Sequence, residues 1–311
     1  MNFHFISVIC GSVFALTASG VAIAADMPVK ARPLAVVTST WTGWYVGGNV
    51  GYGWGDARAD VDGNASLITV QQLSGQFFTP STFSFADTNK ARLSGIIGGG
   101  QVGYNYQFGP QWMLGVEADI QGSGQRGSNQ LVAPFSTPVC VNARLEGTAN
   151  GEVGVCDTFQ PFNGTAATSY QARIEWFGTV RGRVGFLLDR QLLFYGTAGL
   201  AYGRVSLAGN SVISGSTQNN SNTFTTIVPF SDAKTRLGYS AGAGVEGRLP
   251  TWLSSNWTWK LEYLYIDLGS LNSAATFTAS GLNLTVANGA ITTHAHFVDN
   301  IVRVGLNYQF H

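Results

Sequence analysis

Charged residues recur at every second position in several segments of the chain, separated by small or apolar residues. Glu117 and Asp119 stand this way in one segment, and Arg181 and Arg183 in another. Successive side chains of a strand point to opposite faces, so such charges gather on one face. Carboxylates and guanidinium groups held together away from water form charge-assisted hydrogen bonds. The chemistry predicted for these residues is therefore ion pairing in an enclosed interior.

The opposite faces of the same segments are apolar and rich in aromatic residues. One of them, in the segment 112–121, consists of Trp112, Leu114, Val116, Ala118 and Ile120. A soluble sheet turns its polar face to water and its apolar face to a core. Here the apolar faces are long, and the polar faces hold small residues and charges of both signs. This pattern favours lipid outside and a packed polar interior, with a soluble β fold as the alternative.

The composition agrees with such an inverted arrangement. Only 11% of the 311 residues are charged, whereas soluble proteins carry about 25%. The 17 Lys and Arg residues balance the 17 Asp and Glu residues. A neutral chain lacks the broad positive surface that nucleic-acid binding requires, so that class is excluded.

Eight segments with this alternation predict eight strands. They are 44–54, 93–108, 112–121, 173–188, 192–205, 236–249, 257–266 and 298–310. Three connections are short, namely 109–111, 189–191 and 250–256. The others are long and polar, namely 55–91, 122–171, 206–235 and 270–295. Because outer-membrane barrels have short periplasmic turns and long external loops, we predict an all-β fold over 44–311. It is an eight-stranded antiparallel transmembrane β-barrel with four long external loops.

An eight-stranded barrel is just wide enough to be filled by side chains. The charges predicted to point inward are Glu117, Asp119, Arg173, Glu175, Arg181, Arg183, Arg236, Glu246, Arg248, Lys260, Glu262, Asp299 and Arg303. Counting residues from the periplasmic ends of the strands pairs Glu117 with Arg183 and Asp119 with Arg181. The interpretation is a plug made of salt bridges, and the alternative is a narrow, porin-like ion path through the same charges.

The beginning of the chain indicates export. Residues 1–24 contain an apolar stretch and end in Ala22, Ile23 and Ala24, the small-x-small pattern of a cleavage site. This predicts a signal peptide over 1–24 and a periplasmic N-terminal segment over 25–43, with a retained anchor helix as the alternative. No later run reaches the roughly 18 apolar residues of a membrane-spanning helix, so a crossing must use strands.

A short phrase occurs twice, as VGYNYQF ending at Phe108 and as VGLNYQF ending at Phe310. Both copies end strands that descend to the predicted periplasmic interface. Aromatic residues at that height form the girdle of a membrane barrel, where a ring meets both hydrocarbon and water. One copy precedes a turn and the other ends the last strand.

Four stretches together resemble a known family. They are WTGWYVGGNVGYGWG at 41–55, TVRGRVGF at 179–186, WKLEYLYIDLG at 259–269 and VRVGLNYQF at 302–310. The chain resembles the alphaproteobacterial small outer-membrane β-barrel proteins, the outer-membrane immunogenic or porin-like surface antigens. The resemblance implies a place in the cell outer membrane, in contact with outer-membrane lipid and lipopolysaccharide. It also implies that Tyr308 and Phe310, here followed by His311, form the terminal signal read by the barrel-assembly machinery.

Cysteine and histidine residues offer the remaining candidate sites. Cys140 and Cys156 lie in the second predicted loop, where an oxidising compartment favours a disulfide over free or metal-binding thiols. His294 and His296 lie on one face of a strand and could share a metal or a haem iron, and some members of the resembling family are described as haem binders. Solvated histidines at the barrel mouth are the alternative.

The function predicted from the sequence is a structural, surface-exposed outer-membrane barrel. A surface adhesin or a haem or ligand receptor is the rival from a different class. Neither a cofactor nor a metal is predicted, because the two histidines have no third ligand nearby. Catalysis on lipid A would need a nucleophile and base on the external rim, and many loop serines fit that role equally well. We therefore expect no enzymatic activity.

Overall fold

The computed structural model describes residues 40–73, 75–147, 153–218, 223–250, 256–281 and 284–310. The predicted signal peptide and His311 lie outside these residues. The strands are β1 Gly43–Leu73, β2 Gly75–Phe108, β3 Trp112–Glu146, β4 Val153–Leu187, β5 Leu192–Thr217, β6 Thr223–Arg248, β7 Trp257–Gly281 and β8 Leu284–Gln309. The described residues contain no helix long and apolar enough to cross a membrane.

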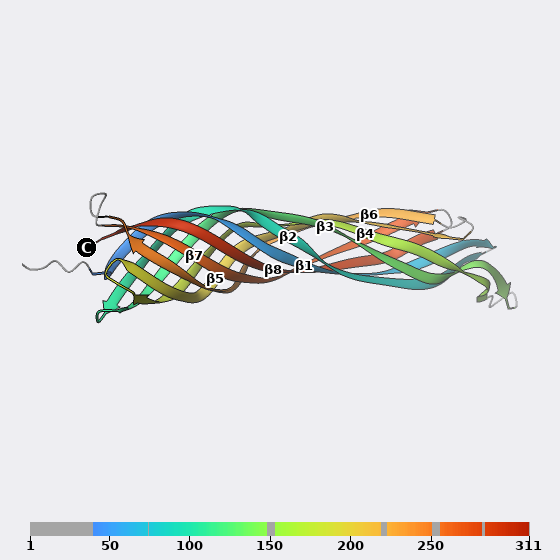
Figure 1. Ribbon diagram of the computed structural model, residues 1–311. Helices are drawn as coiled ribbons and strands as arrows, with labels where there is room; N and C mark the ends of the chain where they lie inside the picture. The colour runs from blue at the N-terminus through green and yellow to red at the C-terminus, as the bar shows by residue number, and fades with distance from the viewer. Residues whose placement is uncertain are drawn as a thin grey trace, which may run out of the picture. The chain divides into compact units, whose positions relative to one another are not determined.

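The eight strands form one closed antiparallel ring in chain order, and β1 pairs with β8 to close it (Figure 1). The predicted eight-stranded barrel is confirmed. The first turn runs through Gly109, whose φ of 72° lies in the left-handed region that glycine tolerates best. The connections from β2 to β3, from β4 to β5 and from β6 to β7 lie together at one end of the ring, which we call the turn end.

The strands are far longer than the sequence pattern predicts. They have between 25 and 35 residues, whereas about 9–11 residues cross a bilayer. The ranges predicted to be long loops, such as 55–91 and 122–171, are mostly strand. The prediction of four long polar loops is therefore wrong. Near the turn end, the outward-facing side chains of the strands form an apolar band. We call the part of the strands beyond this band the extension. It consists of the described residues within 55–93, 127–175, 204–238 and 268–298.

β1 shows why the extension forms strands. As far as Trp54, its exposed outward side chains are apolar, as at Val50 and Tyr52. From Asp56 onward the outward side chains are polar, while inward ones such as Val61 are buried and apolar. Alternation thus continues along the whole strand, but the two faces exchange chemistry after Trp54. The apolar band that suits lipid ends there, and an ordinary water-exposed sheet begins.

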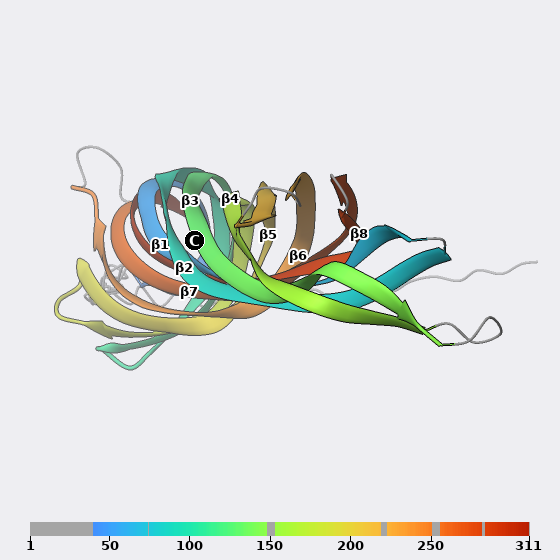
Figure 2. The same cartoon turned by 90° about the vertical axis from the view of Figure 1, so that its right-hand side faces the viewer.

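In the extension the ring opens into two sheets. The β2–β3 ladder stops at Ser94 and Arg126, and the β6–β7 ladder stops at Tyr239 and Asp267. All other ladders continue, so β7, β8, β1 and β2 form one sheet and β3 to β6 form the other. Figure 2 shows the β1–β2 and β3–β4 hairpins extending beyond the remaining strands. Pairing without a free edge therefore holds only within the apolar band.

Aromatic side chains fill the space between the two sheets. Phe83 of β2 stacks on Phe135 of β3 with ring centroids 4.1 Å apart, and Phe162 of β4 stacks on Phe224 of β6 at 5.6 Å. All four are buried. Burying such a side chain contributes about 1.5–3 kcal/mol. The extension is therefore held by an apolar core, unlike the ring within the apolar band.

Candidate functional site

Glu117 lies at the centre of the polar interior of the ring. Lys260 Nζ lies 3.0 Å from each of its carboxylate oxygens, and the Tyr45 hydroxyl donates to it at 2.7 Å. Arg181 also donates to Glu117, and Arg303 approaches at 3.4 Å. These groups come from β1, β3, β4, β7 and β8. One carboxylate on β3 thus gathers donors from across the ring.

Two further carboxylates share the same cations. Glu262 accepts from Arg303 Nε at 2.6 Å and from Arg181 Nη1 at 3.0 Å. Asp119 accepts from Arg181 and Arg303, each at 2.9 Å. Each guanidinium therefore bridges several carboxylates, and the network is continuous across the lumen.

Arg183 and Glu246 extend the network toward the turn end. Arg183 Nη2 donates to Glu246 at 2.7 Å, and Thr258 and Asn307 donate to the same carboxylate at 2.6 and 2.9 Å. The Arg183 guanidinium also stacks on the Tyr195 ring at 4.0 Å from its centroid. Among the described residues, Glu246 thus accepts from several donors and forms its ion pair with Arg183.

The network is electrically balanced and closed to solvent. It contains four carboxylates and four cations, and each of these side chains is at most 3% exposed. The members are Glu117, Asp119, Glu246, Glu262, Arg181, Arg183, Lys260 and Arg303. Desolvating an ion costs several kcal/mol, and only such close pairing offsets it. The network thus brings eight buried charged side chains together inside the ring.

Both ion pairs predicted from strand ends are present, Glu117 with Arg183 at 3.4 Å and Asp119 with Arg181 at 2.9 Å, but the two residues of each pair are offset by two along the β3–β4 ladder. Glu117 faces Arg181 across the β3–β4 ladder, and Arg183 faces Gly115. The Glu117–Arg183 contact is correspondingly long, at 3.4 Å. Barrel stagger moves neighbouring strands past one another, and a count from the turns leaves it out.

Glu175 does not point inward, and that prediction is wrong. It is the extra residue of a β-bulge in β4, between Ile174 and Trp176, so both Ile174 and Phe177 face the interior. Glu175 is exposed and forms an ion pair with Arg204 at 3.0 Å on the outside. Arg173, predicted to point inward with it, is exposed as well. A bulge inserts one residue and reverses the alternation beyond it.

Three other predicted residues lie outside the network. Asp299 is buried but accepts from Gln125 at 2.7 Å and has no cation partner within the described residues. Arg236 is only half-buried and makes no ion pair within the described strands. Arg248 lies at the turn end, where it stacks on the Trp41 ring at 4.9 Å.

Trp41 closes the turn end, which sequence reasoning missed. It is 1% exposed and packs with Met113, Leu187, Leu193 and Tyr195. Its backbone oxygen accepts from Gln309, and its indole N–H donates to the backbone oxygen of Arg190. The predicted N-terminal segment 25–43 therefore contributes a buried side chain to the ring. The sequence does contain a hint of this position, because Trp41 lies four residues before the inward-facing Tyr45 and therefore falls on the same face of an alternating segment.

The predicted disulfide and histidine residues lie in the extension. Cys140 and Cys156 are joined by a disulfide with a Cα–Cα distance of 5.9 Å. His296 contacts Ser270 through Nδ1 at 3.0 Å and Asp267 through Nε2 at 3.3 Å, so both ring nitrogens are engaged. Among the described residues, no group of three or more His, Cys, Asp or Glu side chains could hold a metal.

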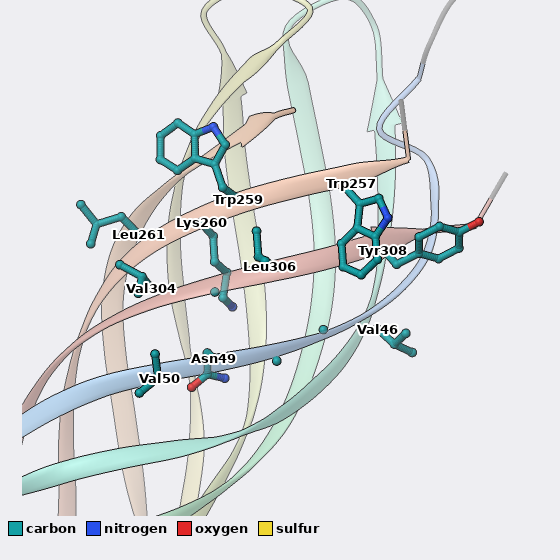
Figure 3. A pocket seen from close by; sticks show the side chains of 13 residues that line it. Val46, Asn49, Val50, Trp257, Trp259, Lys260, Leu261, Val304, Leu306 and Tyr308 are labelled. Carbon is teal, nitrogen blue, oxygen red and sulfur yellow. The ribbon is translucent and has the colours of Figure 1, made fainter. Parts of the chain in front are cut away.

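Outside the ring, the apolar band carries aromatic residues near the turn end. Figure 3 shows a groove across β7, β8 and β1, where Trp259 and Leu261 lie on the outer side of β7. Lys260 between them is buried in the interior. Tyr308 packs on Trp257 and Phe310 with centroids 5.4 and 5.1 Å apart. The predicted terminal signal therefore lies in this girdle.

Known proteins match the chain along most of its length. The family model of the outer membrane protein beta-barrel domain matches residues 13–310. A 31 kDa outer-membrane immunogenic protein of Brucella melitensis is 33% identical over 308 residues, covering 98% of this chain and 99% of that protein. A 22 kDa outer membrane protein of Rhizobium leguminosarum is 29% identical over 247 residues, covering 79% of this chain and 71% of that protein.

Among solved structures, the outer membrane protein OprG from Pseudomonas aeruginosa aligns at 11% identity and a TM-score of 0.29, covering 86% of this chain and 97% of that one. This TM-score is too low to support a conclusion about function. The match of the family model, however, agrees with the closed ring, its apolar outer band and its polar interior. The chain is thus an outer-membrane protein that belongs to the outer membrane protein beta-barrel domain family.

Proposed function

We propose that this protein is a structural barrel whose lumen does not conduct ions and whose extension is displayed at the cell surface. The observation that carries the proposal is the balanced network of eight buried charged side chains. A hydrated pore leaves its lining charges in water, whereas here each carboxylate is held by cations and hydrogen-bond donors. Removing any one member would leave a net charge in the interior without compensation.

Two further layers support closure. Below the network, toward the turn end, Trp41 and its apolar neighbours cover the lumen. Beyond the network, buried apolar side chains such as Phe177, Val205 and Ile301 continue into the apolar core of the extension. An ion would have to displace packed aromatic side chains at both levels. Such displacement costs several kcal/mol per side chain.

Single-channel recording on the protein reconstituted in a planar bilayer tests this proposal. We expect no discrete current steps for the wild-type protein. Stable, reproducible steps at low voltage would refute a closed lumen. Variants that open the network provide the positive control, because they show that the reconstituted protein is inserted and can be made to conduct.

A narrow ion path is the second candidate, and one observation favours it. Buried polar atoms without a hydrogen-bond partner include Asp119 Oδ1, Arg303 Nη1 and Arg183 Nε. Such atoms usually bind single buried waters. A chain of these waters could carry protons or small ions even where the side chains stay in place. The same recordings separate the two candidates, because a water chain gives small but non-zero currents that change with proton concentration.

We also propose that the protein has no catalytic role. The relatives it resembles are named as an outer-membrane immunogenic protein and an outer membrane protein. The charged groups of the interior are neutralised by one another and buried, so they are poorly placed to meet a substrate. Incubation with purified lipopolysaccharide, followed by mass spectrometry, tests this: any change in acyl chains or phosphates would refute it.

A further inference from the structure

A patch of basic side chains lies just beyond the outward apolar band on β1 to β4. Its members are Arg58, Lys90, Arg92, Arg126 and Arg173, and all are exposed. On β1, β2 and β3 they follow closely on the last outward apolar residues, Trp54, Ile96 and Ile120, which are 44%, 68% and 58% exposed. With the short turns in the periplasm, this is the height at which the headgroups of the outer leaflet lie.

Two pairs of these cations stand directly opposite each other. Arg58 faces Lys90 across the β1–β2 ladder, and Arg126 faces Arg173 across the β3–β4 ladder. Like charges directly opposite on neighbouring strands destabilise a sheet. An anion bound between them would turn each repulsive pair into an attractive site.

The other exposed cations of the extension are paired with acids. Arg144 lies 2.9 Å from Asp157, Arg204 lies 3.0 Å from Glu175, and Lys234 lies 2.8 Å from Asp232. None of the five patch residues forms an ion pair within the described residues, although Arg173 donates to Gln171. The patch is thus distinguished from the other exposed cations of the described extension by its lack of ion pairs.

The patch also surrounds a groove. Eight residues of β1, β2 and β3 line it, namely Asp56, Arg58, Thr88, Asn89, Lys90, Arg92, Ser128 and Asn129. Asn129 donates to the backbone oxygen of Lys90 at 2.7 Å and so holds the two strands together where their ladder has ended. Three carboxylates, Asp56, Asp60 and Asp62, lie on the same stretch of β1, and Asp56 faces Arg92 across the β1–β2 ladder. Glu175, next to Arg173 on β4, pairs with Arg204 outside the patch. Five cations against three carboxylates leave a net charge of +2.

We propose that this patch binds the phosphate groups of the glycolipid in the outer leaflet of the membrane. Lipid A is a lipid with phosphates at headgroup height, so its acyl chains would lie along the apolar band while its phosphates meet the cation pairs. The site would fix the depth and rotation of the barrel relative to the lipid. It rests on the outer-membrane location and is independent of whether the lumen conducts.

Binding of phosphorylated lipid A to the refolded protein in zwitterionic nanodiscs tests the proposal. The variants are R58Q/K90Q and R126Q/R173Q, and the matched control is R144Q/R190Q, which removes two exposed cations elsewhere. We expect each patch variant to bind about thirtyfold more weakly, at about 1 kcal/mol for each basic residue near an anionic surface. The control should stay within threefold of the wild type. Gel mobility before and after boiling verifies that every variant is folded.

Thermal unfolding gives a second readout with the opposite sign. Without lipid A, the patch variants should unfold at a higher temperature than the wild type, because the repulsive pairs are gone. With lipid A, the wild type should gain stability and the patch variants should not. Equal binding by patch and control variants would overturn the proposal, as would equal stabilisation by dephosphorylated lipid. If inorganic phosphate at the same concentration stabilises the wild type as much as lipid A, the occupant is free phosphate and the lipid assignment is wrong.

Discussion

Arg183→Ala tests the filled interior most directly. The Arg183 guanidinium donates to Glu246 at 2.7 Å and to the Tyr45 hydroxyl at 2.6 Å, and it stacks on Tyr195. Among the described residues, removing it leaves Glu246 with two neutral donors, Thr258 and Asn307, and without its ion pair. Glu117, by contrast, keeps three other cations. The consequence of the substitution therefore falls on Glu246.

The expected loss of stability is large. Breaking a buried pair by removing one partner costs about 3–5 kcal/mol when the remaining charge is desolvated. Glu246 is 2% exposed, which places it in that range. If water enters the space left by the side chain, the cost falls but the same water provides a path for ions. Stability and conductance are thus expected to change together.

Urea unfolding in detergent, followed by tryptophan fluorescence, measures the free energy of unfolding, and planar-bilayer recording measures the current. Arg144→Ala is the matched control, because its ion pairs are exposed and worth about 0–1 kcal/mol. We expect Arg183→Ala to unfold at markedly lower urea and to show current steps absent from the wild type. A free energy within 1 kcal/mol of the wild type, with no current, would refute the view that the network fills the lumen.

The structure also decides which second substitution should rescue the first. Exchanging Glu117 and Arg183 would place a new cation beside Arg181, Lys260 and Arg303. The exchange should therefore not restore stability, although the two side chains form an ion pair. Arg183→Met combined with Glu246→Gln removes both charges and should cost less than Arg183→Ala alone. A double-mutant cycle with no coupling would contradict the assigned pair.

Three other outcomes are expected from the ring, its last strand and its disulfide. The closed ladder within the apolar band should survive cold detergent, so the protein should change gel mobility only after boiling; equal mobility in both samples would count against a barrel. Phe310→Ala should leave unfolded protein in the periplasm, because Phe310 belongs to the terminal signal. Phe108→Ala changes an aromatic residue of the same girdle outside that signal and should assemble. Normal surface levels of Phe310→Ala would disprove the role of Phe310. Cys140→Ser should lower the stability of the extension by up to about 3 kcal/mol, the chain-entropy value for a loop of about 15 residues. The change of gel mobility on boiling should remain. Loss of that mobility change would show that the disulfide supports the ring itself.

Within the apolar band, the sequence predicted the two faces of the strands well. Trp257, Trp259 and Leu261 lie outside and Lys260 and Glu262 inside, as the period of two requires. Such assignments succeed because lipid and a polar lumen impose opposite chemistry on alternate residues. A single misplaced charge on the lipid side would cost about 2–4 kcal/mol near the bilayer midplane.

The errors have physical causes that a single period cannot reveal. Beyond Trp54 the alternation persists with reversed faces, so polar outward residues such as Arg58 resemble a loop when only an apolar outer face is sought. At Glu175 a bulge reverses the phase, and it shows only in the pairing of β4 with its neighbours β3 and β5. The offset of two residues between Glu117 and Arg183 along the β3–β4 ladder depends on the stagger between the strands. Pairing and stagger are properties of the closed ring rather than of any one strand.

The two seams of the extension present strand edges, and such edges invite neighbouring molecules to add a strand of their own. On β3, Pro138 faces Pro161 across the ladder, so neither can bond the other, and the backbone oxygen of Pro138 instead accepts from Ser81 of β2 across the seam. Pro134, four residues away, has the same orientation along this edge. Neither proline has an N–H to offer, so an incoming strand would lose bonds at both positions. In a crowded membrane, where identical barrels meet side by side, this edge discourages self-association of the surface-exposed sheets.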